Sequence, residues 1–478
     1  MSDVVLAIDL DGTLLRTDSL VEALCELLRE RPLALVKGAL TLGVHGRAVF
    51  KGWVADHARL DVAGLPLNTP LLDWLGAERA AGRRLVLATA ADRRIAEAVA
   101  ARVGLFDTVL ASDEGHNLKG ERKALALVAR FGQGGYDYAG DSPADLPVWR
   151  EARRAIVVGG PGLARAAGRV AEVERVFAPV YGRAAALLRA LRPHQWVKNL
   201  LLFLPLVAAH SATDGPRLLA AALAFLAFGL TASAVYLFND LLDLPADRRH
   251  PRKCRRPFAA GDLPLVWGLL LTPLLLLAAA ALSLLALPPV FTLVLAGYVM
   301  LTTAYSFGLK RKPILDVMLL ATLYTVRVIA GAAAVAIPPS FWLLAFSMFI
   351  FLSLALSKRY TELHGLLLRG ELTAAGRGWH VDDLSLVQTL GTGAGLACVL
   401  VLALYIDSAP AQRLYATPEV LWFVCPLLLY WIGWLWFKTH RGEMHDDPVV
   451  FALRDHVSLL IGALTAGIVL LATVGVAP

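Results

Sequence analysis

Residues 239–257 read NDLLDLPADRRHPRKCRRP and directly follow a long apolar segment, 218–238. The acids Asp240, Asp243 and Asp247 are spaced i, i+3 and i+7, so on a helix they share one face. Three carboxylates on one face repel one another unless a cation lies among them, and oxygen ligands suit Mg²⁺ that carries a phosphorylated substrate. The basic residues that follow could bind the phosphate oxygens. A solvated loop at a membrane edge would explain the basic residues and leave the acids unexplained.

The composition outside this stretch is that of a membrane protein with a soluble part. Of the 478 residues, 57% are hydrophobic, and the mean hydropathy is +0.60. From Leu200 onward, apolar blocks of about 18 or more residues recur, each long enough to cross a bilayer. The net charge of +7 is then explained by cytoplasmic loops and phosphate binding, so no nucleic-acid partner is expected. The four scattered cysteines predict neither a disulfide framework nor a zinc site.

The apolar pattern predicts nine membrane spans. They cover about 198–214, 218–238, 264–287, 289–307, 314–337, 339–356, 384–406, 418–437 and 456–476. Basic residues concentrate in every second loop, and the opposite loops offer only Arg217 and Arg413. By the positive-inside rule, the basic loops and the N-terminal domain are cytoplasmic. The N-terminus has no basic region ahead of its apolar run, so no cleaved signal peptide is expected. The sequence therefore predicts a multi-pass protein of the inner (cytoplasmic) membrane.

The first part of the chain alternates short apolar runs with helical segments, which predicts a parallel α/β sheet. The predicted strands are 4–8, 84–88, 137–140 and 155–158. A mostly helical insert follows the first strand, at about 14–80. Its segment 32–44 is apolar but too short to span a bilayer, so we expect a cap or an interfacial helix there.

The first predicted strand ends in the pattern Asp9-Leu-Asp11-Gly12-Thr13. Alternate residues at the end of a strand point the same way, so both acids can reach one site. An aspartate can attack phosphorus and form an aspartyl-phosphate when a metal and basic residues offset the charge. The second acid is placed to protonate the leaving oxygen.

Three further pieces follow in order along the chain. They are Thr89 after the second predicted strand, Lys123 at the start of a helix 123–131, and Asp141 with Asp145 after the third strand. Together with the DxDGT pattern, these pieces resemble the four motifs of the haloacid dehalogenase (HAD) phosphatase superfamily over about residues 1–178.

The HAD resemblance implies that Asp9 is the nucleophile and Asp11 the acid/base, while Thr89 and Lys123 hold the phosphoryl group. The implied Mg²⁺ ligands are Asp9, Asp141, Asp145 and the carbonyl of Asp11. Lys119 is the alternative to Lys123. We prefer Lys123 because Leu127 and Phe131 follow it at helical spacing, whereas Lys119 lies in a turn that contains glycine.

Further polar motifs lie at the cytoplasmic ends of the predicted spans. They are RPHQWVKN at 192–199, AYSFGLKRKPILD at 304–316 and SKRYTE at 357–362. Arg327 lies about three helical turns deeper than Asp316. Charged groups within spans are costly and usually functional, although a buried pair with a carboxylate or with backbone carbonyls would also explain Arg327. Because all these motifs are at one face, they can surround one polar mouth with the 239–257 stretch.

From about residue 190 onward, these motifs resemble the UbiA superfamily of intramembrane prenyltransferases, which has nine helices and an NDxxDxxxD first motif. Within that superfamily they are most similar to the decaprenyl-phosphate phosphoribosyltransferases. The aromatic-prenylating members usually carry DxxxD as their second motif, but here Asp316 is followed four residues on by Leu320. The missing carboxylate weakens the grip on a prenyl diphosphate and leaves room for phosphoribosyl diphosphate as the donor.

This second resemblance implies transfer of 5-phosphoribose to a polyprenyl (decaprenyl-type) phosphate in the synthesis of a cell-wall precursor, with release of pyrophosphate. Asp240, Asp243 and Asp247 would act in catalysis by holding Mg²⁺ and the leaving diphosphate. The candidate substrate-binding residues are Lys198, Asn239, Arg248, Lys253, Arg255, Arg256, Tyr305, Lys310, Asp316, Arg327, Lys358 and Arg359. Of these, Lys198 and Arg327 are candidates for the lipid phosphate.

The sequence thus predicts a multidomain protein. A HAD-like α/β domain covers 1–178, a linker 179–191, and an all-α UbiA-like membrane domain 192–478. Because both domains face the cytoplasm, the HAD domain could remove the 5-phosphate from the lipid product. Two alternatives stay open: an aromatic prenyltransferase for quinone precursors with an accessory phosphatase, and a transporter or scaffold with a regulatory HAD domain, which would place polar residues near the bilayer midplane. The lipid length and the oligomeric state stay open too.

Overall fold

The computed structural model describes residues 4–112, 117–179, 181–373, 377–444 and 447–475. The chain forms two compact units. The first unit comprises residues 1–192 and 236–273, and the second comprises 193–235 and 274–478. The first unit therefore contains the 239–257 stretch together with the N-terminal residues. The limits of the two sequence domains, 1–178 and 192–478, stay predictions.

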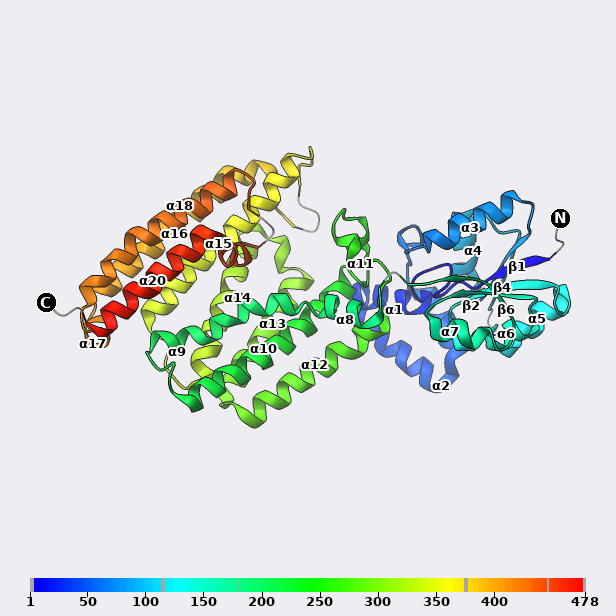
Figure 1. Cartoon of the computed structure of the whole chain (residues 1–478), viewed down its shortest axis with the longest axis horizontal. Helices are drawn as coiled ribbons and strands as arrows, with labels where there is room; N and C mark the ends of the chain where they lie inside the picture. The colour runs from blue at the N-terminus through cyan, green and yellow to red at the C-terminus, as the bar shows by residue number, and fades with distance from the viewer. Residues whose placement is uncertain (1–3, 113–116, 180, 374–376, 445–446, 476–478) are drawn as a thin grey trace. The chain divides into compact units, whose positions relative to one another are not determined.

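The N-terminal part of the first unit is built on a six-stranded sheet with the order β3-β2-β1-β4-β5-β6, in which all neighbours are parallel (Figure 1). The strands are β1 (Val5–Ile8), β2 (Leu85–Asp92), β3 (Thr108–Ser112), β4 (Tyr136–Gly140), β5 (Arg154–Val158) and β6 (Glu172–Phe177). All four predicted strands are present. The two that the sequence pattern missed, β3 and β6, are the edges of the sheet, where a partly exposed strand lacks a continuous apolar run.

Both faces of this sheet are covered, as a parallel sheet requires. Leu6 and Ile8 of β1 pack with helices on one face, and Val5 and Ala7 pack with helices on the other, because successive side chains of a strand point to opposite faces. The first set of helices is α3 (Thr69–Ala80) and α4 (Arg93–Val103); the second is α5 (Glu121–Phe131), α6 (Leu146–Glu151) and α7 (Pro161–Ala167). The carboxyl ends of the neighbours β1 and β4 meet at one edge, where the motif acids follow.

The predicted helical insert is confirmed as helical. It consists of α1 (Ser19–Glu30), α2 (Pro32–His57), the 3-10 turn η1 (Val62–Gly64) and α3. Asp18 caps α1 by accepting hydrogen bonds from the backbone N–H groups of Leu20 (2.9 Å) and Val21 (3.1 Å). Helix α2 begins at Pro32, a favourable first position, and runs well beyond the predicted apolar segment 32–44.

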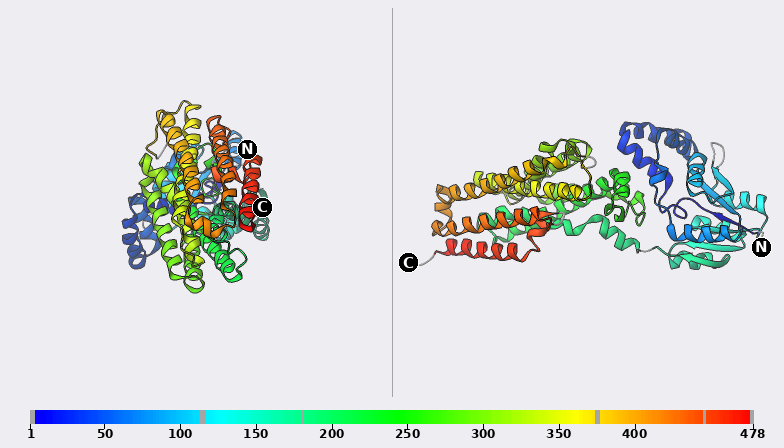
Figure 2. Two further views of the ribbon diagram at one scale, coloured as in Figure 1. Left: turned by 90° about the vertical axis from the view of Figure 1, so that its left-hand side faces the viewer. Right: turned by 90° about the horizontal axis from the view of Figure 1, so that it is seen from above.

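Eight helices of the described residues are long and apolar enough to cross a membrane. They include α10 (Gly215–Leu242), α12 (Leu265–Ala286), α13 (Pro289–Phe307), α14 (Pro313–Ala334), α15 (Phe341–Leu367), α16 (Leu384–Ile406), α18 (Val424–His440) and α20 (His456–Val474). In the second unit, α16, α18 and α20 lie side by side (Figures 1 and 2).

The predicted first span, 198–214, is not one continuous helix. Its residues form the end of a 3-10 helix, η3 (Pro193–Phe203), and then the short α9 (Leu204–Ala208). Pro205 has no backbone N–H to donate at this point, and His210 adopts a positive φ of 52°, which ends the helical run. The described residues contain eight candidate spans, so the prediction of nine is not confirmed.

Candidate active sites

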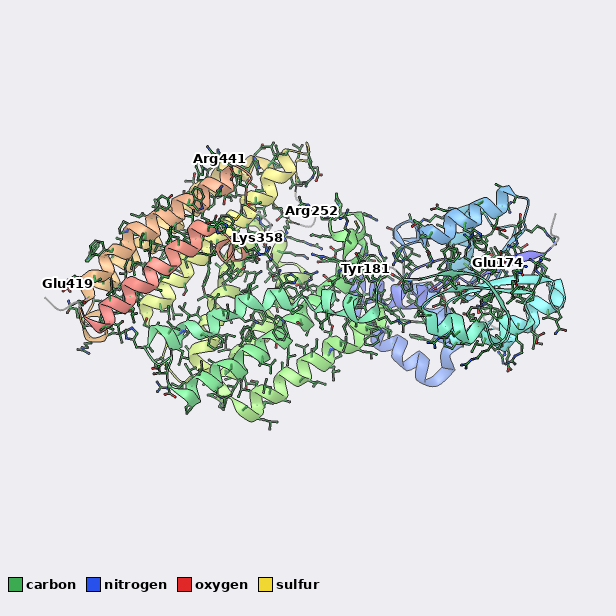
Figure 3. All side chains as sticks on the ribbon, in the orientation of Figure 1. Glu174, Tyr181, Arg252, Lys358, Glu419 and Arg441 are labelled. Atoms are coloured by element: carbon green, nitrogen blue, oxygen red, sulfur yellow. The ribbon has the colours of Figure 1, made fainter. Side chains whose placement is uncertain are left out.

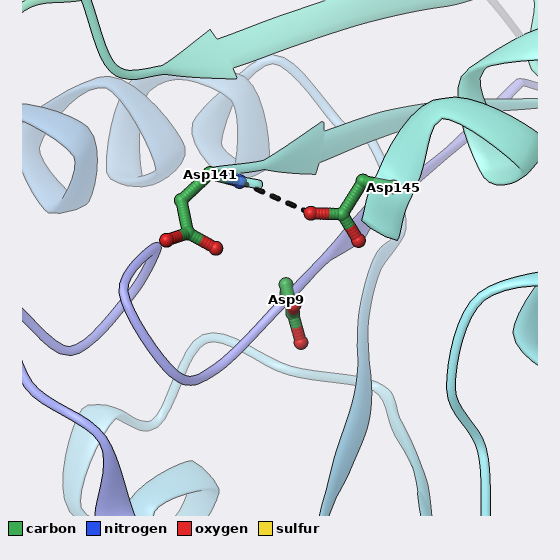
Figure 4. A group of neighbouring side chains, drawn as sticks. All are labelled: Asp9, Asp141 and Asp145. Atoms are coloured by element: carbon green, nitrogen blue, oxygen red, sulfur yellow. Dashed lines mark hydrogen bonds between the residues drawn. The ribbon is translucent and has the colours of Figure 1, made fainter. Parts of the chain in front are cut away.

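Three carboxylates converge where β1 and β4 end (Figure 4). Asp9 follows β1, and Asp141 and Asp145 follow β4. Each offers one oxygen, and these three oxygens all lie within 4.8 Å of one another. Asp145 also accepts hydrogen bonds from the backbone N–H groups of Asp141 (3.2 Å) and Ser142 (3.1 Å). The parallel pairing of β1 with β4 therefore brings together the first and last predicted HAD motifs.

Lys123 supplies the positive charge at this cluster. It lies in the first turn of α5 and is buried, with Nζ 3.0 Å from Asp9 Oδ1 and 3.7 Å from Asp145 Oδ1. Its ammonium donates a hydrogen bond to the hydroxyl of Tyr138 (2.7 Å), which in turn donates to Asp145 (2.9 Å). Lys119, the alternative, is exposed. Of the two lysines, Lys123 is the one that the fold brings to the acids.

The turn after β1 holds Asp11 against the start of α1. The backbone N–H of Ser19 donates to Asp11 Oδ1 (2.8 Å). Gly12 has a φ of +76°, and a Cβ there would lie 2.1 Å from Asp141 Oδ2, so the turn requires glycine. Thr89 was expected after the second strand but lies buried within β2, where its hydroxyl oxygen accepts from the N–H of Ala91 (3.0 Å).

The electrostatics of this site favour a bound cation. Burial, followed by the charge of Asp9, raises the pKa of Asp141 to about 8. Burial, followed by the charge of Asp18, raises the pKa of Asp11 to about 7. Burial is also the main cause of the raised pKa of Asp9, which Lys123 only partly offsets. Crowded carboxylates with a single lysine lack positive charge, and Mg²⁺ prefers such oxygen ligands. The residues therefore fit Mg²⁺.

The 239–257 stretch is not the single helix that the acid spacing predicted. Helix α10 ends just before Asp243, and α11 (Leu244–Arg249) begins after it, because Pro245 lacks the N–H that would continue the helix. The backbone stays close to helical nevertheless: the N–H of Asp243 donates to the carbonyl of Asn239, and that of Asp247 to the carbonyl of Asp243, both at 2.8 Å.

Two arginines form ion pairs with acids of this stretch. Arg192 Nη2 donates to both carboxylate oxygens of Asp240, at 2.7 and 2.8 Å. Arg256 Nη1 donates to Asp240 (3.2 Å) and to Asp247 (2.6 Å). Burial raises the pKa of Asp247 to about 6 although Arg256 opposes the change. Among the described residues, the three acids of this stretch do not form a close group like that at β1 and β4.

Among the other lysines and arginines of the stretch, the side chain of Arg248 is only 9% exposed, whereas Arg249, Arg252, Lys253 and Arg255 are exposed. Arg248, predicted to bind phosphate, is instead paired with Glu22 of α1, with Nη1 3.1 Å from Glu22 Oε2. Lys253 and Arg255 lie on the turn η4 with exposed side chains. Phosphate binding by these two residues stays a prediction.

In the second unit, two lysines share one carboxylate. Buried Lys198 forms an ion pair with Asp447, and Nζ of Lys358, labelled in Figure 3, lies 4.0 Å from the same oxygen. Burial alone would raise the pKa of Asp447, but the two lysines outweigh it and lower that pKa. Asp447 also caps α19 (Pro448–Ala452) by accepting from the N–H of Val449 (3.0 Å). Among the described residues, this cluster pairs two lysines with one carboxylate.

Arg327 is buried in α14 without a carboxylate among its described ion-pair partners. It donates to Asn199 Oδ1 (3.1 Å), to the hydroxyl of Tyr298 (2.9 Å) and to the carbonyl of Leu323 (2.5 Å). The backbone-carbonyl explanation is thus partly correct. The side-chain amide nitrogen of Asn199 is buried without a hydrogen-bond partner among the described atoms. The charged guanidinium of Arg327 and the side-chain amide of Asn199 therefore lie side by side, and both are hydrogen-bond donors.

Asp316 and Arg359 form a buried ion pair. Both side chains are fully buried, and Arg359 Nη2 lies 2.7 Å from Asp316 Oδ2. Asp316 also accepts from the hydroxyl of Tyr305 (2.7 Å) and from Trp379 Nε1 (2.8 Å). The carboxylate of Asp316 is therefore surrounded by three protein side chains and is not exposed. Lys310 lies apart from this group, on a partly buried 3-10 turn.

A model of the UbiA prenyltransferase family matches residues 200–454, more than half of the chain. The chain belongs to the UbiA prenyltransferase family. A model of haloacid dehalogenase-like hydrolases matches residues 6–150, so a HAD-like domain precedes the UbiA domain. Both domains indicate an enzyme, and the eight apolar helices together with the family identify an integral multi-pass membrane protein.

Relatives of this UbiA-family chain cover either both domains or the membrane domain. The uncharacterized protein y4nM of Sinorhizobium fredii is 39% identical over 96% of this chain and 89% of its own. The nodulation protein NoeC of Azorhizobium caulinodans is 37% identical over 59% of this chain and 92% of its own. The decaprenyl-phosphate phosphoribosyltransferase of Mycolicibacterium smegmatis is 33% identical over 60% of this chain and 92% of its own.

Sequence reasoning missed several partners in the UbiA and HAD domains. Arg192, Tyr138 and Glu22 each bind a predicted site residue. Asp447 carried a usable signal, because an aspartate directly before a proline is a typical helix start, and here it lies in a basic loop. Arg192 begins the polar motif at 192–199, but its spacing did not indicate Asp240 as its partner; Tyr138 and Glu22 carried no signal.

Proposed function

We propose that the UbiA domain transfers the 5-phosphoribosyl group of phosphoribosyl diphosphate to a polyprenyl phosphate, and that the HAD domain then removes the 5-phosphate. The observation that carries this proposal is the similarity to the decaprenyl-phosphate phosphoribosyltransferase of Mycolicibacterium smegmatis, which extends over 92% of that protein. The departure at Leu320, where a second-motif carboxylate would stand, supports the same donor.

In the transfer step, an oxygen of the polyprenyl phosphate bonds to C1 of the ribose, the bond from C1 to the diphosphate oxygen breaks, and pyrophosphate leaves. Arg192 forms an ion pair with Asp240, and Arg256 forms ion pairs with Asp240 and Asp247. A bound diphosphate offers these arginines better partners, because guanidinium groups bind phosphate oxygens bidentately. The released carboxylates, with Asp243, would then be available to a metal ion.

For the lipid phosphate, we propose the basic residues of the second unit. Lys198 and Lys358 share one acid, and Arg327 has none among its described ion-pair partners. Lys198 and Arg327 also lie over the same ring, that of Tyr324, at 5.9 and 5.6 Å from its centroid. An anionic phosphate would be attracted to these three basic side chains.

The proposed metal is Mg²⁺ in both domains. In the HAD domain, Asp9, Asp141, Asp145 and the carbonyl of Asp11 would hold it; in the UbiA domain, Asp240, Asp243 and Asp247 would. When bound, Mg²⁺ neutralises phosphate charge and offsets the crowded carboxylates. The donor sets are carboxylate and carbonyl oxygens, which this ion prefers.

In the HAD domain, a carboxylate oxygen of Asp9 attacks the phosphorus, and the bond from phosphorus to the ribose O5 breaks. Asp11 gives its proton to that leaving oxygen, for which a pKa of about 7 is well suited. Water then attacks the phosphorus of the aspartyl-phosphate while Asp11 takes a proton from that water. The bond from phosphorus to the Asp9 oxygen breaks, inorganic phosphate leaves, and both acids are regenerated. Lys123, held by Tyr138, and Thr89 would bind the phosphoryl oxygens.

One assay of the purified protein tests both steps. Wild type and Asp9→Asn are incubated with labelled phosphoribosyl diphosphate and polyprenyl phosphate, and the lipids are separated. We expect wild type to accumulate polyprenyl-phosphoryl ribose and Asp9→Asn to accumulate its 5-phosphorylated precursor. If both accumulate the same phosphorylated lipid, the HAD domain serves another substrate. Prenyl diphosphate with an aromatic acid is tested beside them, and prenyl transfer to that acid would overturn the transferase assignment.

The proposed location of both sites is the cytoplasmic side of the membrane. It is supported by the basic residues of the loops that contain the 239–257 stretch and Lys358. Labelling of the native Cys254, which is partly exposed while the other three cysteines are buried, from either side of oriented vesicles measures it, with Cys254→Ser as the control. A reagent that reaches this cysteine only from the outer side would reverse the topology.

A further inference from the structure

The loop that follows the DxDGT motif, residues 12–19, is held by a segment of the 239–262 region in the same compact unit. Arg16 Nη2 lies 2.7 Å from Asp262 Oδ1, and the Asp262 carboxylate is buried. Arg189 approaches the other oxygen of that carboxylate at 3.5 Å. A predicted HAD catalytic loop thus contacts the residues directly after the first UbiA motif.

The contact at Arg16 is close enough to require a glycine. Gly261 has a φ of +72°, and a Cβ there would lie 2.5 Å from both the Cβ and the carbonyl oxygen of Arg16. A backbone carbonyl cannot turn aside as the end of a long side chain can. Any other residue at this position must therefore displace the 12–19 loop or its neighbour.

A second contact lies beside the first. Glu22 of α1 accepts a hydrogen bond from the hydroxyl of Thr17 (2.7 Å) and a bidentate pair from Arg248 (3.1 and 2.5 Å). The Glu22 and Arg248 side chains are only 4% and 9% exposed, so water does not compete effectively for either charge. Arg248 also donates to the carbonyl of Ala259 (3.3 Å), which ties it to the same segment.

The held loop determines the position of Asp11. The N–H of Gly12 donates to the carbonyl of Thr17 (3.2 Å), and the N–H of Ser19 donates to Asp11 Oδ1 (2.8 Å). A shift at Arg16 or Thr17 therefore moves the donor that orients this carboxylate. At the opposite end of the segment, Arg256 binds the first-motif acids.

We propose that Arg248 and residues 256–262 form a brace that positions the acid/base residue of the HAD domain. The brace makes the HAD site fully competent only while it is docked on the first UbiA motif, and Arg248 is a positioning residue. This inference rests on the proposed phosphatase activity of the HAD domain. Because coupling between two sites is reciprocal, occupancy of either site also biases the other.

Two substrates separate a positioning effect from a general loss of activity. Ribose 5-phosphate has an alkoxide leaving group that needs a proton from Asp11, whereas para-nitrophenyl phosphate releases a stable anion. In the full-length protein, we expect Gly261→Ala and Arg248→Gln to lower kcat/KM for ribose 5-phosphate by about 10-fold or more, and less for para-nitrophenyl phosphate.

Two matched variants control for strain and for burial. Gly134 has a φ of +68° with open space around its Cβ position, and Arg83 is a buried arginine paired with Asp137 far along the sequence. Gly134→Ala and Arg83→Gln should change kcat/KM for the two substrates by the same factor. An equal loss for both substrates in Gly261→Ala, or a profile like that of Gly134→Ala, would overturn the brace.

Hydrogen exchange of backbone amides tests whether the brace stabilises the 12–19 loop, and it needs no enzymatic activity. We expect the Gly12 and Ser19 amides to exchange about 10-fold faster in Gly261→Ala than in Gly134→Ala; equal rates would refute the brace. If wild type and Asp9→Asn hydrolyse neither ester nor the lipid product, the proposed phosphatase activity fails, while the exchange rates still decide whether the brace exists.

Discussion

The HAD and UbiA motifs of this chain each present three aspartates, but the two groups are compensated differently. At the ends of β1 and β4, Asp9, Asp141 and Asp145 bring oxygens within 4.8 Å of one another beside a single lysine. In the 239–257 stretch, Asp240 and Asp247 are bridged by Arg256. The first group lacks positive charge, and the second has its positive charge supplied by the protein.

This difference indicates how each site meets its phosphate. The HAD acids are held by strand ends and turns that cannot move apart, so a metal ion is the natural complement before any substrate arrives. The UbiA acids are closed by arginine side chains, which are long and can exchange a carboxylate for a phosphate. Under the proposed function, the first site is preorganised for the metal, and the second opens when an anionic donor binds.

The largest expected effect is the removal of the HAD nucleophile. Asp9→Asn keeps the shape of the side chain but cannot form the aspartyl-phosphate, so release of phosphate should fall by about 10⁴-fold. Phosphate release from the lipid product and from para-nitrophenyl phosphate measures it. Asp73→Asn, an exposed acid on α3, is the control. A residual rate within about tenfold of wild type would exclude Asp9 as the nucleophile.

Removal of an acid that pairs with arginine in the 239–257 stretch should slow the transferase reaction. Asp240→Asn keeps an acceptor for Arg192 but loses the charge that a metal needs, so pyrophosphate release should fall by about 100-fold or more. Asp214→Asn, at the opposite end of the α10 region, is the control. Unchanged pyrophosphate release would show that the acid serves only to bind arginines.

The parts of the fold that follow from local patterns were predictable. Central strands such as β1 are buried on both faces and therefore read as continuous apolar runs, and spanning helices are recognised by length alone. The edge strand β6 carries Glu172 and Glu174 on its exposed side and lacks that pattern. The break at Pro205 was visible in the sequence but was outweighed by the apolar residues around it.

The candidate sites were predictable where topology alone brings residues together. The HAD resemblance named Asp9 and Asp141, and the parallel pairing of β1 with β4 brings these two residues together. The pairing of Arg192 with Asp240 bridges 48 positions and depends on how a helix end packs, which no spacing rule contains. The pairing of Arg248 with Glu22 has the same origin. The sequence shows that residue 248 is basic, but it does not show which acid lies beside it in the fold.

Loss of Arg256, which bridges Asp240 and Asp247, should change substrate and metal binding by a smaller factor than the two changes above. Arg256→Gln leaves Asp240 and Asp247 less compensated, so Mg²⁺ should bind more tightly before the donor does, while KM for phosphoribosyl diphosphate rises by about 10-fold. Initial rates at varied donor and Mg²⁺ concentrations measure both constants. Arg252→Gln, an exposed neighbour, is the control. A KM that stays constant would show that Arg256 does not transfer to the donor.

The smallest expected effect concerns pH and the metal at the HAD acids. The pKa of Asp141 is raised from an ordinary 3.8 to about 8, so its contribution to stability is present at low pH and is lost as pH rises from about 4 to about 8. Bound Mg²⁺ favours the ionised carboxylates and should restore that loss. We therefore expect Mg²⁺ to raise the Tm by about 2–4 °C at pH 8 and by less than about 1 °C at pH 5. Asp141→Asn should reduce the difference between the two pH values, whereas an equal Mg²⁺ effect at both would place the metal elsewhere.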